Sequence, residues 1–429
     1  MKICVLGLWH LGSVTAGCLA AAGHTVTGLD FDAEVIANLS KGVPPLYEPG
    51  LEDLIRQGLA DGRLTFTTDA GFALREIDLL WVSYDTPVDE DDQADVAYVL
   101  ERTSRALAGL KSPALVLISS QLPVGSIRLL EERLRDTLPT GTTFACSPEN
   151  LRLGRAIDAF NKPARIVAGV RNDRSRELLG PLFSRYTDHI EWMTVESAEM
   201  TKHALNAFLA ASVSFINEIA VLCEKTGADA REVERALKSE PRIGPRAYLT
   251  PGGAFAGGTL ARDVAFLTGI GAERGATTCL LQAIRQSNDA HRQWAKHKLG
   301  SVFETMQDRA VAVWGLAYKA GTDTLRRSAS VELCRWLASA GARVRAHDPA
   351  VKRIPEELTS IIALCSSPEE ALAGADALVI ATEWPQFTTI SAETIVRAMR
   401  TAIVFDVGRF LARQLDSRPD VRYFTVGKP

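Results

Sequence analysis

The sequence predicts an α/β protein in which two doubly wound parallel sheets are joined by a helical segment with one long central helix. Short apolar runs alternate with helical patterns in the first third of the chain and again after residue 309. Strands that alternate with helices form parallel sheets covered on both faces. From about 196 to 300 the strand pattern disappears. We therefore expect an N-terminal domain over 1–195, a central helical domain over 196–300 and a C-terminal domain over 301–429.

Composition is that of an ordinary soluble globular protein. The 429 residues are 46% hydrophobic and 23% charged, and this length suffices for two or three domains with full-sized cores. A net charge of −4 does not indicate binding to nucleic acid or to an acidic membrane surface. We see no apolar run near the roughly eighteen residues that span a bilayer, and we interpret the apolar start as a strand, not a signal peptide.

The cysteines predict a reducing environment. They form no CxxC pair and no cluster with histidine, so we expect neither disulfides nor a metal site, and a cytoplasmic location. The seven residues are Cys4, Cys18, Cys146, Cys223, Cys279, Cys334 and Cys365.

In the first third, each apolar run ends in a glycine or a polar residue, as strands of a parallel sheet do. A helix is expected over 13–23, after the first run. The expected strands are 2–8, 24–30, 78–84, 114–120 and 142–147.

The segment 197–227 has apolar residues at helical spacing for about eight turns and stops at Gly227. A helix of this length is too long for one α/β unit, so we expect it to connect two domains and also to form part of a dimer interface. Beyond it the α/β pattern restarts, with strands expected within 309–319, 342–349, 376–382 and 402–408.

A glycine-containing turn at residues 7–12 predicts a Rossmann dinucleotide site. The turn follows a strand and opens a helix, and Asp30 lies near the end of the second strand. Gly7 permits the tight turn, Gly12 lets helix and strand pack closely, and the helix N-terminus offers N–H groups to a pyrophosphate. Asp30 would accept from ribose hydroxyls and repel a 2′-phosphate, which favours NAD. Trp9 replaces the middle glycine, so its indole must point away or narrow the site; the alternative is a βα turn that binds no nucleotide.

Longer motifs follow in order along almost the whole chain. They are Tyr47-Glu48-Pro49-Gly50-Leu51, Thr86-Pro87, Leu122-Pro123-Val124-Gly125, Pro148-Glu149, Ser197-Ala198-Glu199-Met200, Ser214-Phe215-Ile216-Asn217-Glu218, Pro241-Arg242-Ile243-Gly244-Pro245, Gly315-Leu316-Ala317 and Thr382-Glu383-Trp384. With them the chain resembles the UDP-glucose/GDP-mannose dehydrogenase family. The resemblance implies two Rossmann-like domains, a homodimer formed through the helical segment and an active site between the domains.

Enzymes of that family oxidise the C6 alcohol of a nucleotide sugar to a carboxylate with two NAD+. A cysteine adds to the intermediate aldehyde, because a thiolate forms readily and attacks carbonyl carbon, and the resulting thioester is hydrolysed. By position, the resemblance implies that Lys202 stabilises the alkoxide and that Asn206 and Asp263 position it or a water. Glu149 would act as acid/base in thioester hydrolysis. Lys202 and Asn206 are one helical turn apart and share a face.

The resemblance also implies binding residues. Arg242 is similar to an arginine that family members contribute to the partner subunit's sugar site, and Lys319 and Arg326 are similar to residues near the nucleotide, where cations suit a diphosphate. Cofactor contacts are implied for Gly7, Leu11, Gly12, Asp30, Thr86 and Gln121, and substrate contacts for Leu151, Arg242, Gly257 and Lys319.

The main departure is Thr259, which stands where the family carries its nucleophilic cysteine. A threonine hydroxyl is far harder to ionise than a thiol, and the sequence shows no His/Asp arrangement to activate it. Cys146 lies near Glu149 in the sequence, but we interpret it as a buried structural cysteine at the end of a strand. Further departures are Val35, Asp85, Gln121, Asn150, Leu153, Arg327 and Ala329.

Three hypotheses follow from Thr259. The favoured one is an NAD-dependent dehydrogenase limited to, or slowed after, the first two-electron oxidation. The second is a full four-electron oxidation through another nucleophile. The third is a non-catalytic protein that binds a nucleotide sugar or NAD; the joint retention of Lys202, Asn206, Glu149 and Asp263 argues against it. The identity of the sugar, or of another polar alcohol, stays open.

Overall fold

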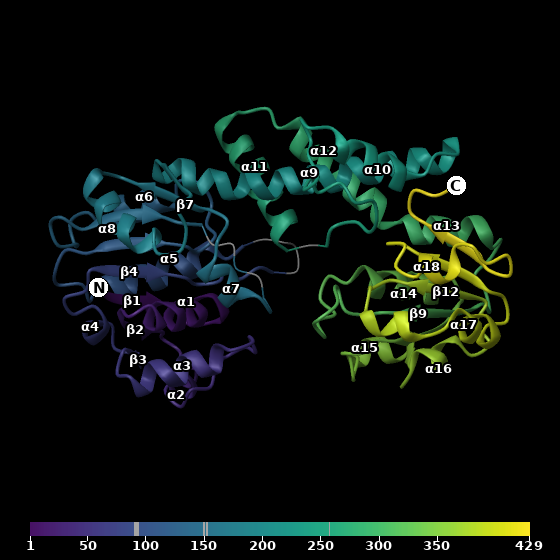
Figure 1. Ribbon diagram of the computed structural model, residues 1–429, viewed down its shortest axis with the longest axis horizontal. Helices are drawn as coiled ribbons and strands as arrows, with labels where there is room; N and C mark the ends of the chain where they lie inside the picture. Colours follow the sequence, from purple (N-terminus) through teal and green to yellow (C-terminus); the bar gives the residue numbers. More distant parts are fainter. Residues whose placement is uncertain (90–93, 149–150, 152, 257) are drawn as a thin grey trace. The chain divides into compact units, whose positions relative to one another are not determined.

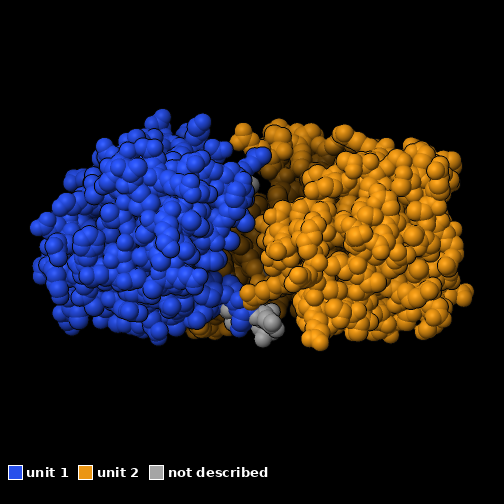
Figure 2. All heavy atoms as spheres, turned by 90° about the horizontal axis from the view of Figure 1, so that it is seen from below, with its two compact units in different colours: residues 1–204 blue, residues 205–429 orange. Residues whose placement is uncertain are grey.

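The structure of the chain is a computed structural model that describes residues 1–89, 94–148, 151, 153–256 and 258–429. The chain divides into two compact units, residues 1–204 and 205–429, coloured separately in Figure 2. The division falls inside the longest helix, α9 (Val195–Thr226), which Figure 1 shows as one continuous ribbon.

The first unit contains an eight-stranded sheet in the order β3-β2-β1-β4-β5-β6-β7-β8. Its neighbouring strands are parallel except for β6 and β7, which pair antiparallel. The strands are β1 Lys2–Leu6, β2 Thr25–Leu29, β3 Leu64–Thr67, β4 Leu79–Val82, β5 Leu115–Ile118, β6 Thr143–Cys146, β7 Ile166–Val170 and β8 Ile190–Met193.

Both faces of this sheet are buried, which explains why its central strands are apolar throughout. Ile3 and Val5 of β1 face one hydrophobic core, and Cys4 and Leu6 face the other. The first core is covered by α1 (His10–Ala21), α2 (Ala33–Leu39), α3 (Leu51–Ala60), α7 (Ala156–Asn161) and α8 (Asp173–Phe183). The second is covered by α4 (Ala70–Ala73), α5 (Val96–Leu107), α6 (Ser126–Leu134) and the first turn of α9.

The second unit contains an all-parallel six-stranded sheet in the order β11-β10-β9-β12-β13-β14. Its strands are β9 Ala310–Trp314, β10 Arg343–His347, β11 Ile362–Leu364, β12 Ala377–Ile380, β13 Ile403–Asp406 and β14 Arg422–Thr425. Its helices are α14 Ala329–Ser339, α15 Glu356–Thr359, α16 Pro368–Leu372, η1 Pro385–Thr389, α17 Ala392–Ala398 and α18 Ala412–Leu415. The helical part of the unit holds α10 Ala230–Ser239, α11 Thr259–Arg274, α12 Cys279–Arg292 and α13 Trp294–Val302 beside the rest of α9.

In each sheet the strand order reverses beside the first strand, between β1 and β4 and between β9 and β12. Ligands of doubly wound sheets bind outside the carboxyl ends of the strands at such a switch point. The turns after β1 and β9 are therefore where binding residues are expected.

The predicted architecture is confirmed: two Rossmann-like α/β sheets and a long central helix that stops before Gly227, whose φ is +83°. The three-domain partition at 195 and 300 stays a prediction. The expectation of no membrane-length apolar segment needs a correction, because α9 is long and apolar enough to cross a bilayer by length and composition. Core helices of soluble proteins meet the same criterion, and α9 carries buried Glu199, His203, Asn206 and Asn217.

Candidate functional site

The turn after β1 is built for close approach of backbone. Gly7 has a φ of +91°, and a Cβ there would lie 2.7 Å from the ring of Tyr84. A Cβ on Gly12 would overlap the carbonyl oxygen of Gly7, so the first turn of α1 packs directly on the strand end. The N–H groups of His10, Leu11 and Gly12 have no intrahelical partner at this helix start, which is where a pyrophosphate binds.

Trp9 is the N-cap of α1 and has an extended backbone with φ −73° and ψ −150°, so the negative φ does not call for a glycine. The residue is 47% exposed, so the indole lies at the surface of the unit. Leu11 is partly buried in the first helical turn. The residues of the turn thus fit a dinucleotide despite the missing middle glycine.

Asp30 follows β2 and is 9% exposed. One carboxylate oxygen accepts from the backbone N of Leu8 at 2.7 Å, and the other accepts from Asp32 N at 3.1 Å. The carboxylate therefore fixes the glycine turn, and its remaining lone pairs are at the edge where a ribose would lie.

The ends of the next two strands are also joined. The Thr86 hydroxyl, after β4, donates to the carbonyl oxygen of Gln121, after β5, at 2.7 Å. Both predicted cofactor residues thus lie at the carboxyl edge of the first sheet with Gly7 and Asp30.

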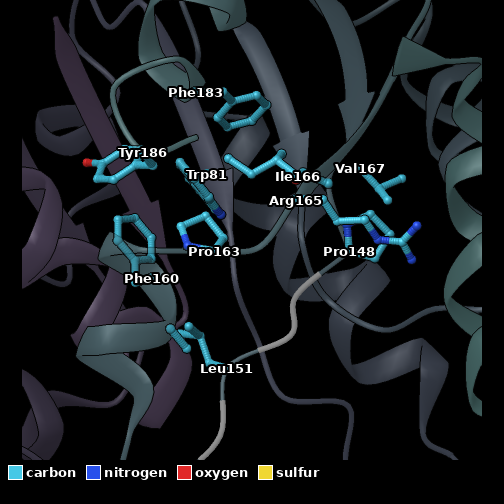
Figure 3. Close-up of a pocket in the computed structure, with 12 residues that line it drawn as sticks. Trp81, Pro148, Leu151, Phe160, Pro163, Arg165, Ile166, Val167, Phe183 and Tyr186 are labelled. Atoms are coloured by element: carbon cyan, nitrogen blue, oxygen red, sulfur yellow. The ribbon is translucent and has the colours of Figure 1, made fainter. Parts of the chain in front are cut away.

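Two predicted site residues, Glu149 and Gly257, lie outside the described residues. Leu151 is described and partly buried, and it lines a cavity of about 80 Å³ whose walls include Trp81, Phe160, Phe183 and Tyr186 (Figure 3). Leu153, which follows it, is 51% exposed.

Asn206 and Asp263 are brought together in the second unit. Asn206 on α9 donates from Nδ2 to the Asp263 carboxylate on α11; the two side chains are 5% and 0% exposed. A buried carboxylate is retained only with such donors, since leaving it unpaired is costly. Lys202 is half-buried one turn before Asn206 on α9, as the predicted shared face requires.

Thr259 is the first residue of α11 and is exposed, one turn before Asp263. No side chain among the described residues accepts a hydrogen bond from its hydroxyl. Gly258 before it has a φ of +104°, and a Cβ there would lie 3.7 Å from the Arg327 guanidinium. The sequence indicated Arg327 only as a departure from the family pattern; its backbone has a left-handed φ of +59°.

Two neighbouring cavities lie at the carboxyl edge of the second sheet and share the segment 253–255. The larger, about 370 Å³, is lined among others by Tyr248, Leu260 and Glu383. Burial, and then nearby Asp406, raises the pKa of the Glu383 carboxyl. The smaller, about 130 Å³, is lined by residues that include Tyr318, Arg292, Arg327 and Ser328.

The remaining predicted substrate residues are at the surface. The Arg242 side chain is 87% exposed and pairs with Glu240 at 2.8 Å. Lys319 is exposed, with its ammonium 5.4 Å from the Tyr318 ring centre. Neither lines the cavities of the second unit that are described above.

The cysteines form no disulfide, and most of their thiols are not accessible. All seven are free; six are buried and only Cys279 is exposed. Burial raises the pKa of the Cys146 thiol well above its ordinary value, which supports the structural interpretation of this residue.

A glycine turn and an acidic residue at the switch point of a parallel sheet are typical of dinucleotide-binding proteins. Residues 1–187 match the NAD binding domain of the UDP-glucose/GDP-mannose dehydrogenase family, residues 196–290 its central domain and residues 312–413 its UDP binding domain. The chain belongs to this family and is an NAD-dependent oxidoreductase that acts on the CH–OH group of a nucleotide sugar.

Known relatives cover the chain end to end. The UDP-glucose 6-dehydrogenase of Pseudomonas aeruginosa is 35% identical over 444 residues, across 100% of this chain and 98% of that protein. The UDP-glucose 6-dehydrogenase of Rhizobium meliloti is 33% identical across 100% of both. The structure of a UDP-glucose dehydrogenase from Pyrobaculum islandicum superposes with a TM-score of 0.86 at 30% identity, over 100% of this chain and 98% of that chain.

Proposed function

We propose that this chain oxidises the primary alcohol of a UDP-hexose with NAD+ and that the oxidation stops, or slows strongly, after the first two-electron step. The family supplies the substrate class. The observation that carries the proposal is Thr259: the position of the family's nucleophile holds an exposed hydroxyl to which no described side chain acts as base.

For the first step, the chain's own residues have to hold the alcohol and take up charge as its proton leaves. The Lys202 ammonium stabilises the developing alkoxide, and Asn206, oriented by Asp263, holds the oxygen or an ordered water. NAD+, which Gly7, Gly12 and Asp30 would hold, would supply the hydride acceptor when bound. The family resemblance assigns acid/base work to the carboxylate of Glu149.

For the second step, a nucleophile has to add to the aldehyde before another hydride can leave. A thiol does so through a readily formed thiolate, whereas an alcohol ionises about five pH units or more above neutrality and needs a base. The α11 N-terminus favours an anion at Thr259 by only about 0.3–1 kcal/mol, which does not close that gap. The aldehyde, or its hydrate, is therefore the expected main product.

No other thiol takes over this role in the proposed reaction. Cys146 is buried with a raised pKa. Exposed Cys279 begins α12, on the far side of the turn that ends the 16-residue α11, so the length of α11 separates it from Thr259. At about 1.5 Å per residue that is roughly 20 Å.

The proposal includes a cytoplasmic homodimer. On α9, three large apolar side chains recur every seven residues and are exposed: Phe208 at 68%, Phe215 at 50% and Leu222 at 56%. A stripe of this kind is typical of a protein–protein interface. Exposed Arg242 would then serve the partner's sugar site. Seven unpaired cysteines favour a reducing compartment.

The test counts NADH formed per UDP-glucose consumed, with mass spectrometry of the product, and repeats the count over a panel of nucleotide sugars. One NADH and an aldehyde or hydrate support the proposal. Two NADH and a uronic acid at an unslowed rate would favour the four-electron alternative. Tight binding of UDP-glucose without turnover would favour the non-catalytic alternative.

A further inference from the structure

A buried hydrogen bond between two side chains connects the cofactor turn to another loop of the same unit. His10 and Glu48 are 7% and 3% exposed, and Nε2 of the imidazole lies 2.9 Å from a Glu48 oxygen. Because a carboxylate only accepts, Nε2 carries the proton and donates. Glu48 lies between β2 and α3, so the pair connects segments 38 residues apart.

Glu48 accepts two further hydrogen bonds, both from backbone. The oxygen bonded to His10 also accepts from Gly154 N at 2.7 Å, and the other oxygen accepts from Ala156 N at 2.9 Å. Burial would raise the pKa of Glu48, but these three donors outweigh it and lower the pKa below its ordinary value. The carboxylate is thus ionised and depends on all three partners.

His10 has two separate roles, one through its backbone and one through its side chain. Its backbone N–H is in the first turn of α1, where a pyrophosphate would bind, while its imidazole donates to Glu48. Gly154 and Ala156 follow Glu149 by five and seven residues and immediately precede or begin α7. A ligand that fixes the backbone of His10 therefore acts on the hydrogen bonds at 154 and 156 through a single carboxylate.

We propose that His10 and Glu48 are positioning residues that transmit NAD+ binding at the α1 N-terminus to the backbone of residues 154–156. Any benefit of this coupling for catalysis rests on the proposed function. The transmission itself requires only the cofactor. A buried carboxylate that loses one of its donors is left partly unsatisfied, so the His10 bond couples the two loops that meet at Glu48.

The test follows the backbone amides that Glu48 holds. Hydrogen exchange of Gly154 and Ala156 is measured by NMR or by fragmentation mass spectrometry, with and without saturating NAD+ and with no sugar present. We expect NAD+ to slow their exchange roughly fivefold or more in the wild-type protein. In His10→Phe the NAD+-dependent ratio should fall to near one.

Matched variants separate transmission from general loss of structure. His10→Gln keeps an N–H near the position of Nε2 and should restore the NAD+ effect. Ser13→Ala removes a different buried hydrogen bond of the same turn, from Ser13 Oγ to Leu8 O at 2.8 Å, and should keep the effect. If His10→Phe does not fold, Glu48→Gln replaces it, since an amide group must face at least one of the three donors.

The inference is overturned if NAD+ binds wild-type protein without slowing exchange at 154 and 156, or if His10→Phe shows the same slowing. Because neither result involves turnover, an unexpected NADH count would reject the proposed function alone and leave this inference standing.

Discussion

At the residue scale, the position at the start of α11 sets how many electrons the proposed reaction removes. Thr259 differs from cysteine by an oxygen in place of sulfur and by an added methyl group, and it is exposed at the helix N-terminus beside Arg327. The neighbouring Asn206–Asp263 pair is intact, so the first proposed step and the second depend on different side chains.

Thr259→Cys should therefore raise the yield from one toward two NADH per sugar and convert the product to a uronic acid. The reason is that a thiolate at a helix N-terminus forms near neutral pH. The measurement is NADH stoichiometry with product mass. Thr259→Ser is the control, because it removes the methyl group but keeps a hydroxyl, and its stoichiometry should stay near one. An unchanged count in Thr259→Cys would show that residue 259 does not decide the outcome.

Asn206→Leu should lower the free energy of unfolding by about 1–3 kcal/mol, since it removes a donor from the fully buried Asp263 carboxylate. Urea denaturation measures the loss. Ser212→Ala on the same helix removes only a local bond to Phe208 O and should cost less than about 0.5 kcal/mol. Equal losses in the two variants would mean that the Asn206–Asp263 pair adds little to stability.

At the element scale, the two sheets use the same arrangement at their switch points. Asp30 after β2 holds the turn after β1, and Asp348 after β10 holds the turn after β9 by accepting from Leu316 N and Ala317 N at 2.7 and 2.9 Å. Each carboxylate fixes a glycine turn, Gly7 or Gly315, that has a left-handed φ.

Asp348→Asn should be destabilising by about 1–3 kcal/mol near neutral pH and progressively less so in acid. Burial would raise the pKa of Asp348, but its backbone donors outweigh it and lower the pKa below 3.8. A lowered folded pKa stabilises above the unfolded value of about 3.9, and this stabilisation is lost as pH falls through the folded pKa. Urea unfolding near pH 7 and near pH 3 measures the difference, with exposed Asp323→Asn as control. A penalty independent of pH would contradict the assignment.

The sequence was sufficient to predict β1, β4 and β5, but not the edge strands β3 and β14 or β7 (Ile166–Val170), which lies next to an edge. Strands β1, β4 and β5 are buried on both faces, so their apolar runs are unmistakable. Edge strands β3 and β14 are partly exposed and mixed in composition, and no strand was expected there. Periodicity reports burial, and edge strands bury too little side chain to produce it.

The candidate site was predictable where it follows a motif and not where it depends on tertiary contact. Gly7 and Asp30 follow the strand ends from which they were predicted, and Thr86, which only the family resemblance implied, follows β4. The bond of Glu48 to Gly154 and Ala156 joins residues more than 100 positions apart, and no local pattern encodes it. Glu48 was noted only as part of a family motif.

At the scale of the whole molecule, the exposed apolar stripe on α9 is a surface that the single chain leaves uncovered. Phe208, Phe215 and Leu222 leave apolar surface in water. Covering such side chains yields about 25 cal/mol per Å².

Phe215→Glu should convert the proposed dimer to a monomer, because a charge in the centre of an apolar interface is left desolvated. Sedimentation velocity measures the change. Leu129→Glu is the matched control, because Leu129 lies on α6 and is 46% exposed. Its replacement should leave the oligomeric state unchanged. A wild-type monomer, or an unaltered dimer in Phe215→Glu, would reject the stripe as the interface.

Cys279 gives the chain one exposed thiol for chemical labelling. Because the other six thiols are buried, a maleimide dye or spin label should attach to the native protein at one place, the start of α12. The label would report from the α11–α12 connection, at the end of α11 remote from Thr259, so spectroscopy could follow that helical hairpin without any engineered attachment point.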